Sequence, residues 1–183
     1  GKRIRPTLML LAYNLFKDDV DSILPAACAL ETYHNYTLLH DDLMDNAPLR
    51  RGHATVHEKW NPNVAILSGD SMLVLSYERM MQCRPDKLKP VLELFTETAL
   101  QIGEGQQYDM EFETRSDVTE DEYLEMIRLK TSVLLACAAK IGAILADAPD
   151  EDADNLYRFA EQVGLAFQLQ DDYLDVYGDS KVF

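Results

Sequence analysis

Apolar residues recur at helical spacing along almost the whole chain, and this pattern is the strongest constraint on its fold. Leucine, isoleucine, valine and alanine return every three to four residues, and no stretch alternates apolar and polar residues between turn signals. The 183 residues include only 8 Gly and 7 Pro, which are few for an all-β chain built on tight turns. The sequence therefore predicts an all-α fold, a bundle of long antiparallel helices around a central apolar cavity.

Start and stop signals divide this pattern into six helices within a single domain over residues 1–183. Pro25 falls in the first turn of the second helix, where its missing N–H costs little. Thr119 and Glu122 form a capping box at the start of the fifth helix, and Gly178 is expected to end the sixth as its C′ residue. A loop with Pro48, Gly52 and Pro62 separates the second helix from the third. The predicted ranges are 6–16, 22–46, 64–82, 86–112, 119–146 and 151–177.

Net charge and cysteine content limit the partners and the compartment. A formal charge of −15 argues against nucleic acid and anionic membranes. No apolar run approaches the ~20 residues of a membrane span, and the first residues do not have the pattern of a signal peptide. Cys28, Cys83 and Cys137 are odd in number and far apart, so they are read as small core residues in a reducing compartment. We expect a cytoplasmic protein.

Two clusters of aspartates end two of the predicted helices. They are Asp41, Asp42 and Asp45 in one helix, and Asp171, Asp172 and Asp175 in the other. Residues four apart share a helix face, so each cluster places like charges side by side near a helix C-terminus, where the macrodipole also disfavours them. Neither cluster has an obvious salt-bridge partner. The pattern indicates a compensating cation, and carboxylates without nearby His or Cys favour Mg²⁺.

These motifs belong to a longer series that resembles the trans-isoprenyl diphosphate synthase (polyprenyl synthetase) family, and in particular its short-chain farnesyl and geranylgeranyl diphosphate synthases. The resemblance extends from the first residue to the last, in the family's order and spacing. The matching segments are GKRIRP (1–6), His34, LHDDLMD (39–45), LRRG (49–52), Gly69-Asp70, GQQYD (105–109), Lys130-Thr131 and FQLQDDYLD (167–175).

The resemblance implies an allylic diphosphate site in which three Mg²⁺ ions bridge the substrate to both aspartate motifs. Asp41 and Asp45 would hold two ions and Asp171 the third, and the other motif aspartates (Asp42, Asp172 and Asp175) would assist, partly through water. The positions that match supports of the allylic diphosphate or its metals are Arg50, Lys130, Gln106 and Asp109. Thr131 and Gln168 match positions whose oxygens face the allylic carbocation. The catalytic set is Asp41, Asp45, Asp171, Lys130, Thr131 and Gln168.

A separate basic site is implied for isopentenyl diphosphate, which is bound without metal in this family. The matching residues are Lys2, Arg5, His34 and Arg51. Taken alone, His34 would be read as a core or dipole-capping histidine, and the basic residues at positions 2, 3 and 5 as a solvated charge run. For Arg3, which has no assigned role in this site, the reading as a solvated charge stays open.

The resemblance implies ionisation, condensation and elimination. The allylic C–O bond breaks, the double bond of isopentenyl diphosphate attacks the cation, and the departing diphosphate takes the proton that is lost. Growing charge on the leaving group has to be neutralised, which clustered metal ions do, and a dry cavity protects the cation from water. The family also implies a homodimer.

The resemblance also implies that product length depends on Tyr36 and Thr37, five and four residues before the first aspartate motif. A tyrosine about 7 Å below the metals along the helix would close the cavity after a few isoprene units, as in C15 or C20 producers, and Tyr36→Ala would then lengthen the product. Five residues is also a rotation of about 140°, which leaves two alternatives open. Tyr36 would then pack between helices, and the floor would be set by Met72, Leu75 or Ser76.

Compared with the family pattern, the chain begins inside the first basic motif and stops at Lys181-Val182-Phe183, so the domain is expected to be truncated at both ends. Lys181 comes too early to match a later lysine that contacts the allylic diphosphate in the family. Three other functions stay open: a longer-chain polyprenyl synthase, a class I terpene cyclase and a non-catalytic subunit of a heteromeric synthase. The second Asp-Asp-Tyr-Leu-Asp motif and the basic site argue against the cyclase, and the presence of all six aspartates argues against the inert subunit.

Overall fold

The computed structural model describes residues 1–178, and these fold into the all-α architecture that the periodicity predicts. The only strands in this range form a two-stranded hairpin in which Leu49 pairs with Ala54. The elements, in order, are α1 (Ile4–Asn14), the 3-10 helix η1 (Val20–Ile23), α2 (Leu24–Met44), β1 (Leu49–Arg50), β2 (His53–Ala54), α3 (Val56–Lys59), α4 (Pro62–Met80), α5 (Leu88–Phe112), α6 (Glu120–Ile127), the π-helical η2 (Arg128–Ser132), α7 (Val133–Leu145) and α8 (Asp150–Tyr177).

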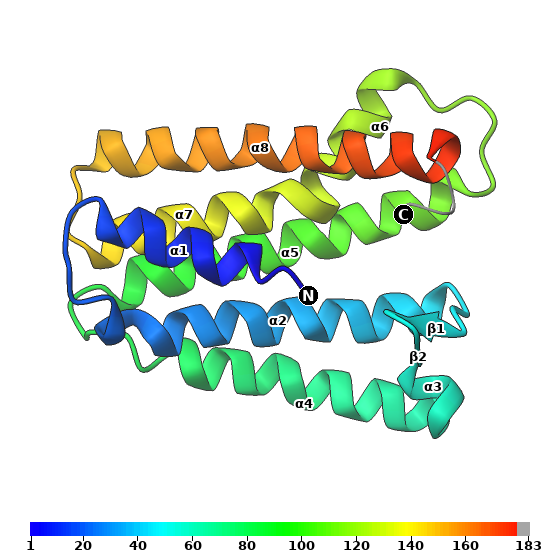
Figure 1. Ribbon diagram of the computed structural model, residues 1–183, viewed down its shortest axis with the longest axis horizontal. Coiled ribbons are helices and arrows are strands. Elements are labelled where there is room, and N and C mark those ends of the chain that lie inside the picture. Colours follow the sequence, from blue (N-terminus) through cyan, green and yellow to red (C-terminus); the bar gives the residue numbers. More distant parts are fainter. Residues whose placement is uncertain (179–183) are drawn as a thin grey trace.

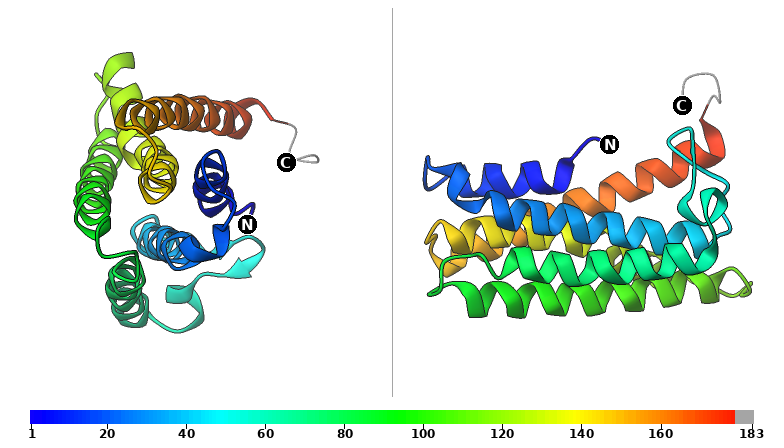
Figure 2. Two further views of the ribbon diagram at one scale, coloured as in Figure 1. Left: turned by 90° about the vertical axis from the view of Figure 1, so that its left-hand side faces the viewer. Right: turned by 90° about the horizontal axis from the view of Figure 1, so that it is seen from below.

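The long helices lie side by side along the long axis of the molecule (Figures 1 and 2). Helix α2 packs on α4, and α7 packs on α1, α5 and α8. Helix α7 is apolar apart from Lys140, and 11 of its 13 residues are buried. A helix without a polar face is stable only when it is surrounded, so α7 forms the centre of this side of the bundle.

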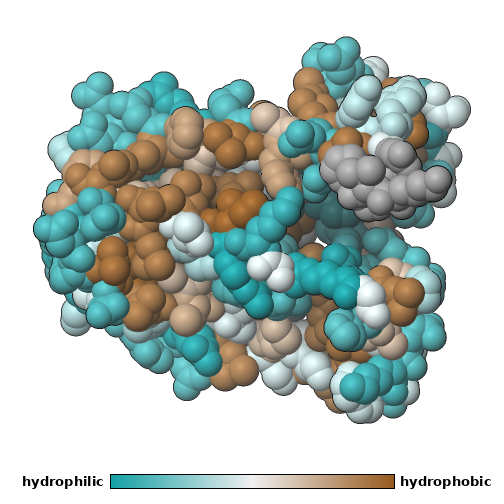
Figure 3. Space-filling model, viewed as in Figure 1, coloured by the Kyte–Doolittle hydropathy of each residue, from teal (hydrophilic) through white to brown (hydrophobic). Residues whose placement is uncertain are grey.

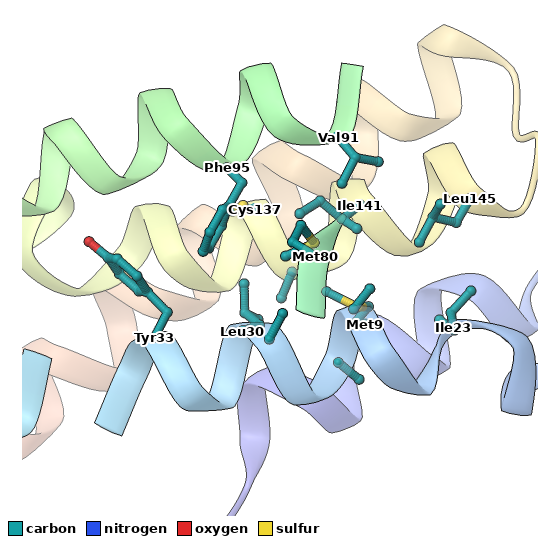
Figure 4. Close-up of a cluster of buried hydrophobic side chains, with 14 of the residues drawn as sticks. Met9, Ile23, Leu30, Tyr33, Met80, Val91, Phe95, Cys137, Ile141 and Leu145 are labelled. Carbon is teal, nitrogen blue, oxygen red and sulfur yellow. The ribbon is translucent and has the colours of Figure 1, made fainter. Parts of the chain in front are cut away.

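The hydrophobic core lies between these helices. It fills the part of the bundle between the aspartate motifs and the opposite end. Its fully buried side chains come from five helices and point toward one another (Figure 4). They include Met9 of α1, Leu30 of α2, Met80 of α4, Phe95 of α5 and Ile141 of α7. Burial of a side chain of this size contributes roughly 1.5–3 kcal/mol, so this cluster is a main source of the bundle's stability.

Local signals act where the sequence predicts them. Pro25 lies in the first turn of α2, and the capping box of Thr119 and Glu122 starts α6. Asn61 also caps α4, because its side chain accepts a hydrogen bond of 3.0 Å from the Val64 N–H.

The structure also corrects three details of the prediction. The region 119–146 is not one regular helix, because the π-helical η2 interrupts it. The hairpin and α3 occupy a region expected to be loop. Gly178 has φ −70° and ψ 149°, so it follows α8 in an extended conformation that any residue adopts. Lys181 lies outside the described residues. No helix over residues 1–178 combines the length and the apolar character that crossing a membrane requires.

Asp147 connects three segments at the end of the bundle opposite the aspartate motifs. Its carboxylate lies 2.5 Å from the Lys17 ammonium, 2.6 Å from an Arg84 guanidinium nitrogen and 3.0 Å from the Lys87 ammonium. Hydrogen bonds from these basic groups, that of Arg84 first, lower the pKa of Asp147 well below its ordinary 3.8. Several cations on one carboxylate make a network of this kind more effective than an isolated surface pair.

We expect Asp147→Asn to lower the melting temperature at neutral pH. The pKa of Asp147 is depressed in the folded state, so its contribution is present above 3.8 and is lost as the pH falls below that value. Thermal unfolding at pH 7 and at pH 3 should show a difference from wild type that shrinks at the lower pH. Asp18→Asn is the control, because exposed Asp18 has no ion pair among residues 1–178. An equal effect of both variants at pH 7 would contradict this role.

Candidate active site

A cavity of about 830 Å³ opens between the C-terminal halves of α2 and α8 and the N-terminus of the chain. Figure 3 shows the hollow on the right of this face, next to a hydrophilic band, whereas apolar side chains gather on the left. The volume is within the usual range for small-molecule sites. The lining comes from α1, α2, the β1–β2 hairpin, α5, η2, α7 and α8, so residues far apart in sequence meet here.

The first aspartate motif has basic partners that were not evident from the sequence. The hairpin brings Arg50 back over the end of α2, where its Nε donates to Asp42 at 2.6 Å and its Nη2 to Asp41 at 3.4 Å. Lys130 lies 3.2 Å from the other oxygen of Asp41. The expectation of aspartates without partners is therefore wrong for this cluster. Asp45 is the C-cap of α2, and burial, followed by the negative charge of Asp41, raises its pKa.

The second motif faces the same cavity from α8. Asp171 and Asp175 line it, as Asp41 does from α2, so the two acidic helix ends converge. Asp172 points elsewhere, because it accepts hydrogen bonds from the Tyr123 hydroxyl of α6 and, at 2.8 Å, from Gln168 Nε2. Asp42, Asp45 and Asp172 are outside the lining.

The π-helical segment η2 presents Lys130 and Thr131 to the cavity. Lys130 Nζ donates to Asp109 at 2.6 Å. Burial opposes the charge of Lys130, but the hydrogen bond to Asp109 and the negative charge of Asp41 outweigh this effect and raise its pKa. Thr131 Oγ1 donates to Gln168 Oε1 at 3.0 Å. A cation and a pair of polar oxygens are thus placed next to the carboxylates.

Two further side chains line the cavity near the aspartate motifs, Gln106 from α5 and Phe167 from α8. The Gln106 amide lies 3.8 Å from the sulfur of Met44, in the turn between the aspartates of the first motif.

A separate basic group lies on the α1 side of the cavity, which is lined by Lys2, Arg5, His34 and Arg51. Arg5 Nη1 is 3.2 Å from His34 Nε2. Burial, together with the charges of Arg5 and Arg51, lowers the pKa of His34 to about 3, so its ring is neutral at pH 7 and accepts from Arg5. Burial lowers the pKa of Arg5 to about 10, which still leaves it charged at pH 7.

The remaining polar groups of this wall are paired differently. Arg3 forms an ion pair with Glu31 at the edge of the cavity. The Lys2 ammonium lies 5.5 Å from the centre of the Phe167 ring, a distance typical of a cation–π contact.

The two chain-length candidates occupy different places. Thr37 lines the cavity, whereas the Tyr36 ring packs 5.4 Å from the Tyr33 ring and 4.8 Å from that of His40, outside the lining. Both neighbouring rings belong to α2, but Tyr36 also packs against the hydrophobic core, which favours the alternative in which it packs between helices. Met72, Leu75 and Ser76 are also absent from the lining among the described residues.

Sequence reasoning missed the apolar part of the site. Leu38 of α2, Ile102 of α5 and Leu134 of α7 line the cavity, and the last two also belong to the hydrophobic core. Each lies three or four residues from a predicted polar residue on the same continuous helical path: Asp41, Gln106 and Lys130, respectively. That spacing places both residues of a pair on one helix face and is the signal that would have found them.

The donor set is suitable for a hard divalent cation. Within residues 1–178, no group of three or more His, Cys, Asp or Glu side chains forms a ready-made metal cage. Mg²⁺ does not require one, since it is usually held by one or two carboxylates together with waters and substrate phosphates. Asp41 Oδ1 is buried, accepts no hydrogen bond and lies 3.2 Å from the Lys130 ammonium, so it is an oxygen that a metal ion would suit as ligand.

Comparisons with known proteins show which family the chain resembles. The profile of the family described as polyprenyl synthetase matches residues 1–183. The chain is 46% identical, over 99% of its length, to the short chain isoprenyl diphosphate synthase of Methanocaldococcus jannaschii, and 45% identical over its whole length to the geranylgeranyl diphosphate synthase of Methanosarcina mazei. The crystal structure of geranylgeranyl pyrophosphate synthetase from Pyrococcus horikoshii superposes on 99% of the chain with a TM-score of 0.95 and 40% identity.

The chain belongs to the polyprenyl synthetase family. It spans 55% and 57% of the two curated relatives and 56% of the Pyrococcus chain, so it corresponds to about half the length of the proteins that it matches.

Proposed function

We propose that the protein is a magnesium-dependent trans-prenyltransferase that joins isopentenyl diphosphate to an allylic diphosphate and releases an all-trans C15–C20 diphosphate. The observation that carries the proposal is one cavity with two differently charged walls: Asp41, Asp171 and Asp175 on one wall, and Arg5 and Arg51 on the other. Two anionic substrates could thus bind side by side, one through metal ions and one through basic side chains. Family membership and the names of the relatives support this reaction.

The acidic wall would bind the allylic diphosphate. Asp41, Asp45 and Asp171 would hold the Mg²⁺ ions, three by family resemblance, and the remaining motif aspartates would assist. Bound Mg²⁺ supplies the positive charge that makes diphosphate a good leaving group. Lys130 and Arg50 add fixed charge at this wall, where they are already ordered by Asp109 and Asp42. Gln106 lies next to them on α5 and would support the same diphosphate.

The basic wall would bind isopentenyl diphosphate without metal. Lys2, Arg5 and Arg51 supply the charge. Neutral His34 adds none, but its hydrogen bond to Arg5 orients the guanidinium, and its second ring nitrogen remains for the diphosphate. Charge-assisted hydrogen bonds of this kind are about twice as strong as neutral ones.

Reaction would occur between the two walls. The allylic C–O bond breaks and its electron pair leaves with the diphosphate; the double bond of isopentenyl diphosphate then forms the new C–C bond, and a proton passes to the departing diphosphate. The oxygens of Thr131 and Gln168 would face the cation. Leu38, Ile102 and Leu134 supply an apolar wall that limits water, which would otherwise capture the cation.

The competing functions fit the site less well. A terpene cyclase has no need for the basic wall, and an inert subunit has no need for carboxylates that converge from two helices. The three cysteines are free, which is consistent with the cytoplasmic location that we propose.

The test is incubation of the full-length protein with labelled isopentenyl diphosphate, Mg²⁺ and dimethylallyl, geranyl or farnesyl diphosphate, followed by chromatographic sizing of the products. We expect an extended prenyl diphosphate that disappears when EDTA removes the metal. A cyclised hydrocarbon would indicate the cyclase, and absence of product with every primer would indicate the inert subunit.

Asp41→Ala should lower turnover by roughly 10²-fold or more, because it removes a metal ligand that acts on the leaving group. Asp152→Ala is the matched control, since exposed Asp152 in the first turn of α8 is outside the cavity lining. Normal Mg²⁺-dependent turnover by Asp41→Ala in the same assay would contradict the assigned role.

Product length is proposed to depend on the α2 residues that precede the first aspartate motif. The sequence predicts that Tyr36→Ala lengthens the product, but only Thr37 lines the cavity. We expect Thr37→Phe to shorten the main product by at least one isoprene unit, because the ring would fill the apolar end. Tyr36→Ala should change the distribution less. A larger change with Tyr36→Ala, measured by the same chromatography, would instead place the floor at the aromatic cluster of Tyr33 and Tyr36.

A homodimer is the assembly that we propose. Leu67 and Val74 on α4 and Met81 at its C-cap follow at intervals of seven residues and are 66%, 68% and 53% exposed. Leu100 of the neighbouring α5 is 67% exposed. An apolar stripe on adjacent helices is typical of a helix–helix interface between subunits.

Val74→Glu should therefore produce monomers, because it places a charge in the middle of that stripe. Light scattering coupled to gel filtration measures the mass directly. Leu11→Glu is the control, because it places the same charge at an exposed apolar residue of α1, away from the stripe. Dimers of unchanged stability in Val74→Glu would show that α4 is not the interface.

A further inference from the structure

Gly105 of α5 lies directly against the backbone of η2. A Cβ at this position would come 2.4 Å from the Lys130 backbone nitrogen and 2.8 Å from Lys130 Cα. Carbon atoms do not approach backbone atoms this closely, so α5 can lie here only because residue 105 has no side chain. Gly105 is fully enclosed in the fold, and it lies on the face of α5 that contacts the segment carrying Lys130.

Asp109 follows Gly105 by one helical turn and therefore lies on the same face of α5. Its carboxylate receives the hydrogen bond of 2.6 Å from Lys130 Nζ. Helix α5 thus contacts both the backbone and the side chain of Lys130. Gly105 allows close approach to the backbone of Lys130, and Asp109 binds its ammonium group.

Helix α8 repeats this arrangement on the other side of η2. A Cβ at Gly164 would come 2.7 Å from Ser132 Cα and 2.8 Å from Ser132 Cβ. Gln168, again four residues later, accepts the hydrogen bond of 3.0 Å from Thr131 Oγ1. Each flanking helix therefore combines a glycine against the η2 backbone with a polar side chain that binds one of the residues presented to the cavity.

The conformation of η2 explains why such support is needed. The Val133 N–H bonds to the Arg128 carbonyl, five residues back, which is the π-helical pattern. A single π turn is rare and occurs often at functional sites. Close packing on both sides fixes where the turn directs Lys130 and Thr131.

We propose that Gly105 and Gly164 are positioning residues for catalysis: they let α5 and α8 approach η2 closely enough for Asp109 to orient Lys130 and for Gln168 to orient Thr131. This inference rests on the proposed function. The two sides differ in what they control, because Lys130 would contact the diphosphate, whereas Thr131 faces the cation.

Two other glycines provide matched controls. Gly142 of α7 is equally tight, since a Cβ there would come 2.3 Å from the Met9 carbonyl oxygen of α1, but it lies ten residues beyond η2. That is about 15 Å along the helix. Gly103 is on α5 two residues before Gly105, and a Cβ there would meet nothing within 4 Å. Gly142→Ala shows what a packing clash far from η2 does by itself. Gly103→Ala shows what a higher helix propensity of α5 does by itself.

The experiment compares Gly105→Ala, Gly142→Ala and Gly103→Ala in the full-length protein. Calorimetry measures the binding of inorganic diphosphate with Mg²⁺, steady-state assays give kcat and KM for each substrate, and thermal unfolding reports on the fold. For Gly105→Ala we expect about tenfold weaker diphosphate binding and a matching rise in the allylic KM, because displacement by about 1 Å is costly in a preorganised site. Gly142→Ala should lower the melting temperature with diphosphate binding unchanged. Gly103→Ala should also leave diphosphate binding unchanged, and it should raise the melting temperature slightly, because alanine favours the helix more than glycine.

Gly164→Ala tests the contact between α8 and η2, and it remains as the test if Gly105→Ala does not fold. It should lower kcat about tenfold and leave the Mg²⁺-dependent binding of inorganic diphosphate as in wild type, because it displaces Thr131 rather than Lys130.

The inference is overturned if both variants only lose thermal stability, as Gly142→Ala does, or if neither folds while Gly142→Ala folds. Wild type that neither binds diphosphate with Mg²⁺ nor transfers a prenyl group would contradict the proposed function itself, and the inference would fail with it. An active wild type with kinetically normal glycine variants would contradict the inference alone.

Discussion

Repulsion between carboxylates is the constraint on which the arrangement of the site depends. Helices α2 and α8 both end in aspartates, at the helix terminus where the backbone dipole is already negative. In the free protein Arg50 and Lys130 balance part of this charge at Asp41 and Asp42. Asp171 and Asp175 line the cavity without an ion pair in the described chain, so a divalent cation would complete the balance.

The two walls of the cavity differ in how they carry charge. The acidic wall combines aspartates with the nearby cations Arg50 and Lys130, whereas the basic wall keeps His34 neutral beside buried Arg5. A metal-bridged diphosphate suits the first wall, and a metal-free diphosphate suits the second. On the proposed function, this separation would let one cavity of about 830 Å³ distinguish two substrates that share the same charged group.

Backbone approach is as important here as side-chain chemistry. The π-helical η2 directs both Lys130 and Thr131 into the cavity, and its neighbours α5 and α8 contact it through glycines. The apolar end of the cavity is shared with the core, since Ile102 and Leu134 belong to both. The site is therefore continuous with the packing that stabilises the bundle.

The sequence by itself determined the helical fold and most helix positions, and it predicted most of the polar residues that line the cavity, because periodicity, caps and motif spacing are local properties. The convergence of Asp41 with Asp171 and the balance of the first motif by Arg50 and Lys130 were decided by tertiary structure. So were the π turn, the neutral state of His34 and the orientation of Tyr36 away from the cavity. Each of these depends on which segments pack together and how closely, and such distances are not written in any local pattern of residues.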